Sequence, residues 1–295
     1  MRRMSRSLGL VTLVGITLIW GTTFVIVKDA LDTISAPLLL ALRFSLAGLL
    51  LCWAGIDRSA WKPAMILGLL SFIGFASQTL GLGLTSASNA AFITGFSVVL
   101  TPLLGALFWG KRLAPRAYLA AAVALAGLAL ISFRNGAGAV NGGDLWVIVC
   151  ALSYACYIIY LGEVAGRVKA RPLAFMQHLP MALLAWLWAG PEVGDLTAVP
   201  LATFLRILYL AAVATALVAV LQVYAQRVVS AHVTALVFAL EPVFASLLAA
   251  WLLGERLGVA GWLGGGLMVL AMLVSELGSR GAPRPLPVIH RSESP

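Results

Sequence analysis

The chain has 295 residues, of which 61% are hydrophobic and only 11% are charged, and its mean hydropathy is +1.00. Soluble domains carry roughly 25% charged and about 45–50% apolar residues, so this composition excludes an ordinary soluble enzyme, a disordered protein and a nucleic-acid-binding domain. The formal net charge of +9 lies mainly in short loops, where it bears on membrane topology rather than on an anionic partner.

Ten segments are long and apolar enough to be membrane helices, since one span needs about 20 mostly apolar residues. Strands are excluded because barrel strands alternate, whereas runs such as 117–131 are apolar on every face. The first segment resembles a signal peptide but has no obvious cleavage site, and we interpret it as an uncleaved span. In chain order, we expect spans at residues 8–28, 36–56, 63–84, 88–109, 115–134, 143–162, 172–190, 201–227, 231–253 and 258–278.

The sequence repeats itself at long range. A shift of 144 residues places Gln78 on Gln222, and a shift of 134 places Trp20 on Tyr154. Span 1 then corresponds to span 6, and the following spans pair in the same order. Each copy holds five spans, an odd number, so the second copy enters the membrane upside down relative to the first.

We therefore predict an all-α integral membrane protein of ten transmembrane helices in two inverted five-helix repeats. The repeats are expected at residues 8–134 and 143–278, followed by a disordered cytoplasmic tail at 279–295. Inverted repeats are typical of secondary transporters, whose substrate site lies near the bilayer midplane between the two halves.

The lysines and arginines indicate the orientation. Most of the 20 fall in one set of loops, including those with Arg6, Lys62 and Arg167, and few fall in the other set, such as Lys28 and Arg206. The positive-inside rule then places both termini in the cytoplasm. We expect an integral protein of a bacterial inner (plasma) membrane.

Four stretches carry a family resemblance. They are Leu18–Phe24, Pro37–Phe44, Ser88–Phe92 and Glu241–Arg256. In this order, and across nearly the whole chain, they resemble the EamA family of the drug/metabolite transporter superfamily. The resemblance implies a central cavity lined by spans 1, 3, 4, 6, 8 and 9, and export of small metabolites, with amino acids as the commonest class. Lys111 departs from the family pattern, which often has an acid there, so no role of that acid is carried over.

The favoured function is a secondary transporter that exports small metabolites, chiefly amino acids including aromatic and apolar ones, by alternating access. The first alternative is a uniporter or exchanger for other small organic solutes or drugs. A channel would need polar residues repeated along one helix face. An intramembrane enzyme would need a nucleophile and a base within reach, such as Ser153 and His178, and we expect no enzyme activity.

No cofactor or metal is expected, because the sequence has no Walker A loop or His-Glu-x-x-His motif and its three cysteines lack metal-ligand spacing. The expected partners are a small-molecule substrate and membrane lipid, with no nucleic acid. Small-residue runs in spans 5 and 10 allow close helix packing, within a monomer or across a weak homodimer.

Two glutamines are the most informative candidates for substrate binding. Gln78 and Gln222 lie at equivalent repeat positions in apolar spans 3 and 8. An amide can donate to a carboxylate and accept from an ammonium without burying a charge, which suits a cavity for zwitterions. The structural alternative is an interhelical hydrogen bond worth about 0.6 kcal/mol.

Aromatic and hydroxyl side chains in mid-span form the second group. Rings there are not interfacial belt residues and can line a pocket, although core packing explains each ring equally well. Threonines more often bond to their own helix. The candidates are Trp20, Thr23, Thr94, Phe96, Tyr154, Tyr157 and Phe238.

Three ionisable residues within spans are candidates for coupling or for structural roles, because such residues are costly in a membrane. Glu241 precedes Pro242 near the middle of span 9, where it could bind a substrate amine, take up a proton or cap a kinked helix. Arg43 could pair with Glu241 or a substrate carboxylate, but extension to the outer headgroups is favoured. His178 could relay protons, but a histidine at the membrane interface is favoured.

Overall fold

The computed structural model describes residues 4–109, 141–190, 199–238, 240–254 and 258–277, with isolated positions between these ranges. The first half holds α1 (Arg6–Ala30), α2 (Ala36–Leu51), η1 (Cys52–Ala54), η2 (Arg58–Ala60), α3 (Trp61–Leu84), α4 (Ala87–Gly95) and α5 (Ser97–Trp109). The second half holds α7 (Gly142–Val164), α8 (Ala170–Met176), α9 (His178–Ala189), α10 (Leu201–Ala211), η5 (Ala212–Leu217), α11 (Val218–Gln226), α12 (Ala231–Phe238), α13 (Glu241–Leu252) and α14 (Val259–Leu277).

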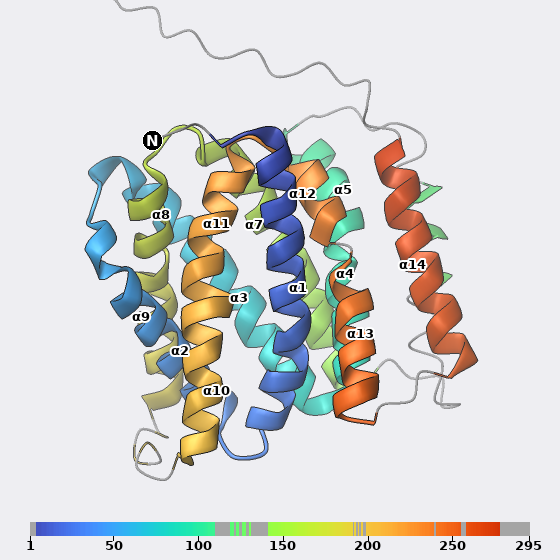
Figure 1. Ribbon diagram of the computed structural model, residues 1–295, viewed down its shortest axis with the longest axis horizontal. Coiled ribbons are helices and arrows are strands. Elements are labelled where there is room, and N and C mark those ends of the chain that lie inside the picture. The colour runs from blue at the N-terminus through green and yellow to red at the C-terminus, as the bar shows by residue number, and fades with distance from the viewer. Residues whose placement is uncertain are drawn as a thin grey trace, which may run out of the picture.

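The helices form an apolar bundle (Figure 1). Within the described residues, six helical stretches are long and apolar enough to cross a membrane, and shorter apolar helices accompany them. The predicted all-α integral membrane fold is confirmed. The six stretches are Arg6–Ala30, Ala36–Ala54, Arg58–Leu84, Ala87–Phe108, Gly142–Val164 and Leu201–Gln226. The predicted tail at 279–295, and most of the predicted span 115–134, lie outside the described residues.

Polar caps explain why several helices begin where they do. Ser5, Ser35, Ser86 and Asn141 each accept a hydrogen bond from a backbone N–H in the first turn of α1, α2, α4 and α7, respectively. The first N–H groups of a helix have no intrahelical acceptor, and such side chains satisfy one of them. Because an unsatisfied backbone N–H is costly in a membrane, these side chains favour helices that begin at the residues that follow them.

Three of the predicted continuous spans are interrupted. The span 88–109 divides into α4 and α5 at Phe96, 172–190 divides into α8 and α9 at Gln177, and 231–253 divides between α12 and α13. Pro242 explains the restart of the last, because proline is tolerated in the first turn of a helix, where its missing N–H is no loss. The span 201–227 stays helical but contains the π-helix η5.

Contacts at helix ends give the relative directions of the helices. Lys28, near the end of α1, donates to the carbonyl of Leu82 near the end of α3 at 2.9 Å, so α1 and α3 run the same way. Gly81, near the end of α3, packs against Val147 near the start of α7. Helix α7 therefore runs opposite to α3 and α1.

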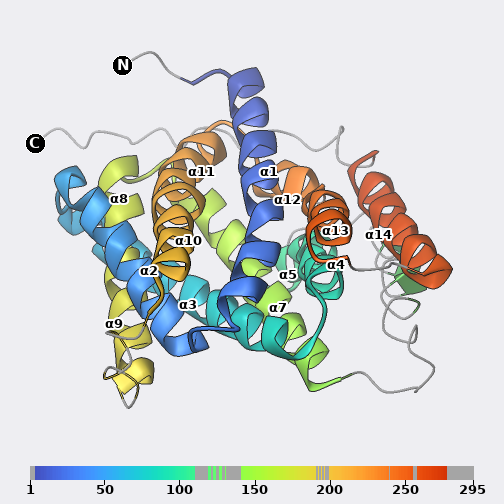
Figure 2. The same ribbon diagram turned by 60° about the horizontal axis from the view of Figure 1, so that its bottom comes forward.

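The next helices of the second half also run opposite to their equivalents. A Cβ added at Gly9, near the start of α1, would lie 2.9 Å from Val229, just after α11, so α11 opposes α1 and hence α3. Gly48 near the end of α2 faces His178 at the start of α9, so α9 opposes α2. In both ribbon views, α2, α8 and α9 lie at one side of the bundle and α14 at the other (Figures 1 and 2).

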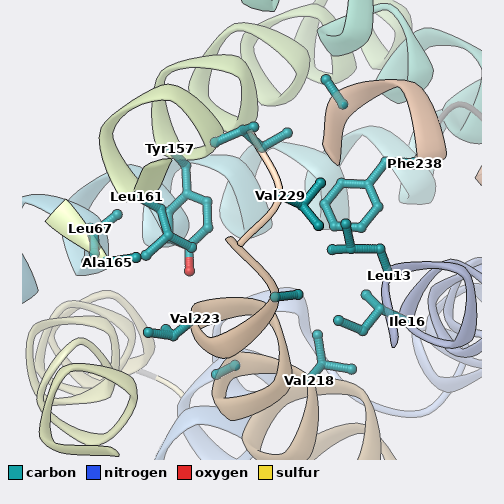
Figure 3. Close-up of a cluster of buried hydrophobic side chains, with 14 of the residues drawn as sticks. Leu13, Ile16, Leu67, Tyr157, Leu161, Ala165, Val218, Val223, Val229 and Phe238 are labelled. Carbon is teal, nitrogen blue, oxygen red and sulfur yellow. The ribbon is translucent and has the colours of Figure 1, made fainter. Parts of the chain in front are cut away.

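The main core lies where α1, α3, α7, α11 and α12 meet. In Figure 3, Val223 of α11 lies on the side of Tyr157 of α7, and Val218 of α11 lies on the side of Ile16 of α1. All four are buried. This cluster joins the first-half helices to the second-half helices, and some of its members also line the cavity described below.

Candidate functional site

A cavity of about 770 Å³, counting the part open to solvent, lies between the two halves of the bundle. Helices α1, α3, α4, α5, α7, α9, α11, α12 and α13 and the π-helix η5 contribute to its wall. All but two of the sequence-predicted residues line it, and their role in substrate binding stays a prediction. The predicted residues in the wall are Trp20, Thr23, Gln78, Thr94, Tyr154, Tyr157, His178, Gln222, Phe238 and Glu241.

Phe96 and Arg43 are the two exceptions. Phe96 lies at the turn between α4 and α5, is 8% exposed and packs into the main core. It is not among the residues that line the cavity, and its role in substrate binding stays a prediction. Arg43 is 2% exposed and its Nε donates to Thr215 Oγ1 at 2.7 Å. The prediction that Arg43 extends to the outer headgroups is therefore wrong, because its side chain turns inward between helices.

The two glutamines line the cavity from α3 and α11 and form different hydrogen bonds. The Gln78 amide donates to Thr94 Oγ1 at 3.2 Å, which joins α3 to α4. The Gln222 amide donates to Gln226 Oε1 at 3.1 Å within α11, and Gln226 in turn donates to the Ile158 carbonyl at 3.0 Å. Both amides are thus oriented by the protein while they face the cavity.

Trp20 links α1 to the π-helix. Its indole Nε1 donates to the Ala214 carbonyl at 3.1 Å, and its ring meets Phe238 edge to face with centroids 4.9 Å apart. A π-helix leaves backbone groups displaced from the usual ladder and often occurs at functional sites. Thr215, in the same π-helix, donates its hydroxyl to the Leu210 carbonyl at 2.7 Å.

Two tyrosines of α7 also line the cavity. Tyr154 packs directly on Gly74 of α3 and meets Phe75 edge to face at 5.7 Å. The Tyr157 hydroxyl donates to Gln177 Oε1 at 3.0 Å, at the break between α8 and α9. The wall is therefore aromatic, with amide and hydroxyl groups at a few fixed points, which is typical of small-molecule sites.

Glu241 and His178 are both buried in the cavity wall. Glu241 is 8% exposed and lies in the first turn of α13, where the helix dipole favours a carboxylate. His178 is 2% exposed, and its Nδ1 lies 2.7 Å from the Ala174 carbonyl. The His178 ring thus faces the cavity inside the bundle, and its position relative to the membrane interface stays a prediction.

Sequence reasoning missed several residues of the wall. Gln177 could have been found, because it is an amide in an apolar span like Gln78. Phe75 and Met181 carry no signal that separates them from core residues, and an Ala-Val-rich run gives no sign of the π-helix. The missed residues are Ser71, Phe75, Ile158, Gln177, Met181, Ala214, Thr215, Val218 and Ala219. Ser97, a hydroxyl that the sequence offered as a weaker candidate, also lines the cavity.

The two groups considered for an intramembrane enzyme each bond to a backbone carbonyl. Ser153 Oγ donates to the Leu70 carbonyl at 2.6 Å. His178 is oriented by Ala174 within its own chain segment. No hydrogen bond joins these two described side chains, so the structure gives no support to a nucleophile and base here.

A helical membrane bundle with interrupted helices around a central cavity is the architecture of a secondary transporter. The profile of the EamA-like transporter family matches residues 7–133 and again residues 141–276. An "uncharacterized transporter" of Archaeoglobus fulgidus is 31% identical over 280 residues, covering 94% of this chain and 87% of the relative. The chain belongs to the EamA-like transporter family, and it is a transporter rather than an enzyme.

Further similarities are more distant. The "uncharacterized inner membrane transporter YedA" of Escherichia coli is 26% identical, covering 88% of each chain. A "probable amino-acid metabolite efflux pump" of Escherichia coli is 26% identical over 298 residues, covering 94% of this chain and 97% of the relative. A crystal structure with 21% identity superposes with a TM-score of 0.68 over 94% of this chain and 98% of the other, which shows a shared fold.

Proposed function

We propose that this transporter exports small metabolites, chiefly amino acids including aromatic and apolar ones, by alternating access through the central cavity. The observation that carries the proposal is a cavity between the two halves whose wall combines aromatic rings, amides and one carboxylate. Rings suit an apolar side chain, and amides suit the polar ends of an amino acid. The efflux-pump name of one relative supports the same substrate class.

We propose further that residues 8–134 and 143–278 are inverted repeats that exchange conformations. The double match of the family profile supports these bounds. The opposed directions of α1 and α7, and of α2 and α9, support the inversion. Two copies related by an axis in the membrane plane have two alternative packings, one open to each side, and exchange between them would carry substrate across.

The topology completes the proposal. The excess of lysine and arginine in one set of loops supports cytoplasmic termini, and a relative named as an inner membrane transporter supports a bacterial inner membrane. We propose a monomer or weak homodimer surrounded by lipid. Labelling of single cysteines introduced near residue 4 and near residue 277 tests the topology, since both should react only from the cytoplasmic side.

Counterflow in proteoliposomes tests the transport activity. Vesicles containing the full chain and preloaded with unlabelled amino acid are given radiolabelled aromatic, apolar and charged amino acids at two pH values. We expect transient accumulation of the aromatic and apolar ones above equilibrium, which a carrier produces and a channel does not. Uptake equal to that of protein-free vesicles for every amino acid would exclude this substrate class.

Glu241 is proposed to meet the ammonium group of the substrate. Glu241→Gln keeps the shape and removes the charge, so phenylalanine affinity should fall by about tenfold, the scale of one charged hydrogen bond. Competition by 3-phenylpropionate, which has no amine, should change little. If the carboxylate also carries a proton, the rate of the wild type but not of the variant will differ between the two pH values.

A further inference from the structure

Arg43 is a buried cation whose charge the protein does not neutralise. Only 2% of the residue is exposed, and its Nη2 atom has no hydrogen-bond partner among the residues that the structure describes. Its Nε donates to Thr215, and its Cζ lies 4.5 Å from the centre of the Phe75 ring. A hydroxyl and an aromatic face stabilise a guanidinium without cancelling its charge.

The described buried acids do not serve as its counter-ion. Asp144 accepts from Thr85 Oγ1 at 2.9 Å and closes the capping box with Asn141 at the start of α7. Glu241 forms no ion pair with Arg43, although both residues lie in the described part of the chain. A charge left unpaired within a membrane bundle is costly, and such residues face substrate or ion pathways.

Arg43 lies one layer behind the cavity wall. Phe75 and Thr215, which its side chain contacts, both line the cavity. Thr215 belongs to η5 and Phe75 to α3, so the guanidinium sits where the two halves of the bundle meet. The guanidinium, with an Nη2 group that has no hydrogen-bond partner, therefore lies next to residues that a ligand in the cavity would contact.

We infer that Arg43 recognises the carboxylate of a zwitterionic substrate while Glu241 holds its ammonium. The inference rests on the proposed function. It gives the substrate two charged contacts, the Arg43 cation and the Glu241 anion, in addition to the aromatic rings of the cavity wall. A guanidinium presents N–H donors in a planar fork that matches a carboxylate, and the resulting hydrogen bonds are charge-assisted. The substrate thus supplies the counter-charge that the protein lacks.

Competition between two ligands tests this role separately from the transport rate. L-Phenylalaninol has the ring and ammonium of L-phenylalanine but carries a hydroxymethyl group in place of the carboxylate. In counterflow of radiolabelled phenylalanine, the half-inhibitory concentration of the alcohol should exceed that of unlabelled phenylalanine by about tenfold or more in the wild type. In Arg43→Met the two concentrations should agree within about twofold.

Three comparisons keep the test decisive. Arg43→Lys keeps the charge but loses the fork, and its ratio should be intermediate. Arg206→Gln removes an arginine that pairs with Asp29 and is half-exposed, and its ratio should equal that of the wild type. Where Arg43→Met transports too slowly, binding can be measured without transport. The concentrations of the two ligands that raise the melting temperature of the detergent-purified protein equally then replace the half-inhibitory concentrations.

The outcomes separate this inference from the proposed function. Retention of the tenfold preference by Arg43→Met would overturn the inference, and so would an equal loss of affinity for both ligands, which a purely structural arginine produces. Absence of amino-acid transport by the wild type would instead overturn the proposed function. A collapsed preference in Arg43→Met with an unchanged one in Arg206→Gln is the expected result.

Discussion

The helices that carry Gln78 and Gln222 approach their neighbours in different ways. Helix α3 is continuous and comes close through glycines, since a Cβ at Gly74 would overlap the Tyr154 ring. The equivalent segment of the second half contains the π-helix Ala212–Leu217, whose Ala214 carbonyl accepts from Trp20. One contact depends on a missing side chain and the other on a displaced backbone carbonyl.

This difference shows that two similar sequences can hold the same polar positions with unlike packing. A glycine contact gains only van der Waals attraction, whereas the π-helix contact is a directional hydrogen bond. In the proposed exchange of conformations, unlike contacts would rearrange on the two sides. The inward-open and outward-open states would then differ in free energy, and substitutions at the two contacts should act unequally.

The largest expected effect is at the glycine contact. Gly74→Val would drive a branched side chain into the Tyr154 ring, and overpacking of this kind costs about 1–3 kcal/mol or more. We expect a clear fall in melting temperature and loss of transport. Gly83→Val is the matched control in the same helix, because a Cβ there meets nothing within 4 Å; equal behaviour of the two variants would refute the packing argument.

A smaller effect is expected at the π-helix contact. Trp20→Phe keeps a ring beside Phe238 but removes the indole N–H, which leaves the Ala214 carbonyl without this donor and costs about 1 kcal/mol. Trp186→Phe is the matched control, because the Ser45 oxygen that accepts from this indole belongs to a hydroxyl, which can rotate and can still donate when the indole is lost. In detergent, the melting temperature of Trp20→Phe should be lower than that of Trp186→Phe. The reverse order would contradict the role of the π-helix.

The smallest effect on stability is expected at the two glutamines. Gln78→Ala removes a hydrogen bond between helices, worth about 0.6 kcal/mol in a membrane, whereas the bond of Gln222 lies within its own helix. Both variants should insert and fold, and both should lower amino-acid uptake several-fold because both amides face the cavity. Unchanged uptake kinetics in both variants would remove these amides from the site.

Much of the candidate site was accessible from the sequence because polar residues are rare in apolar spans. Gln78, Gln222 and Glu241 stand out for that reason, and all three line the cavity. The rings were harder to assign, since Phe96 and Phe238 both lie within apolar spans and hydropathy does not distinguish them. Phe96 lies at a helix break that turns it into the core, and no hydropathy pattern encodes that break.

Hydropathy, span length and long-range repetition by themselves determined that the chain is an all-α membrane protein, because these properties depend on each segment's transfer from water to lipid. Only the tertiary structure decided the surroundings of Arg43, the breaks at Gln177 and before Glu241, and the π-helix that faces Trp20. Those features arise from contacts between residues that are far apart in the chain. Their free energies depend on how helices meet rather than on how apolar each helix is.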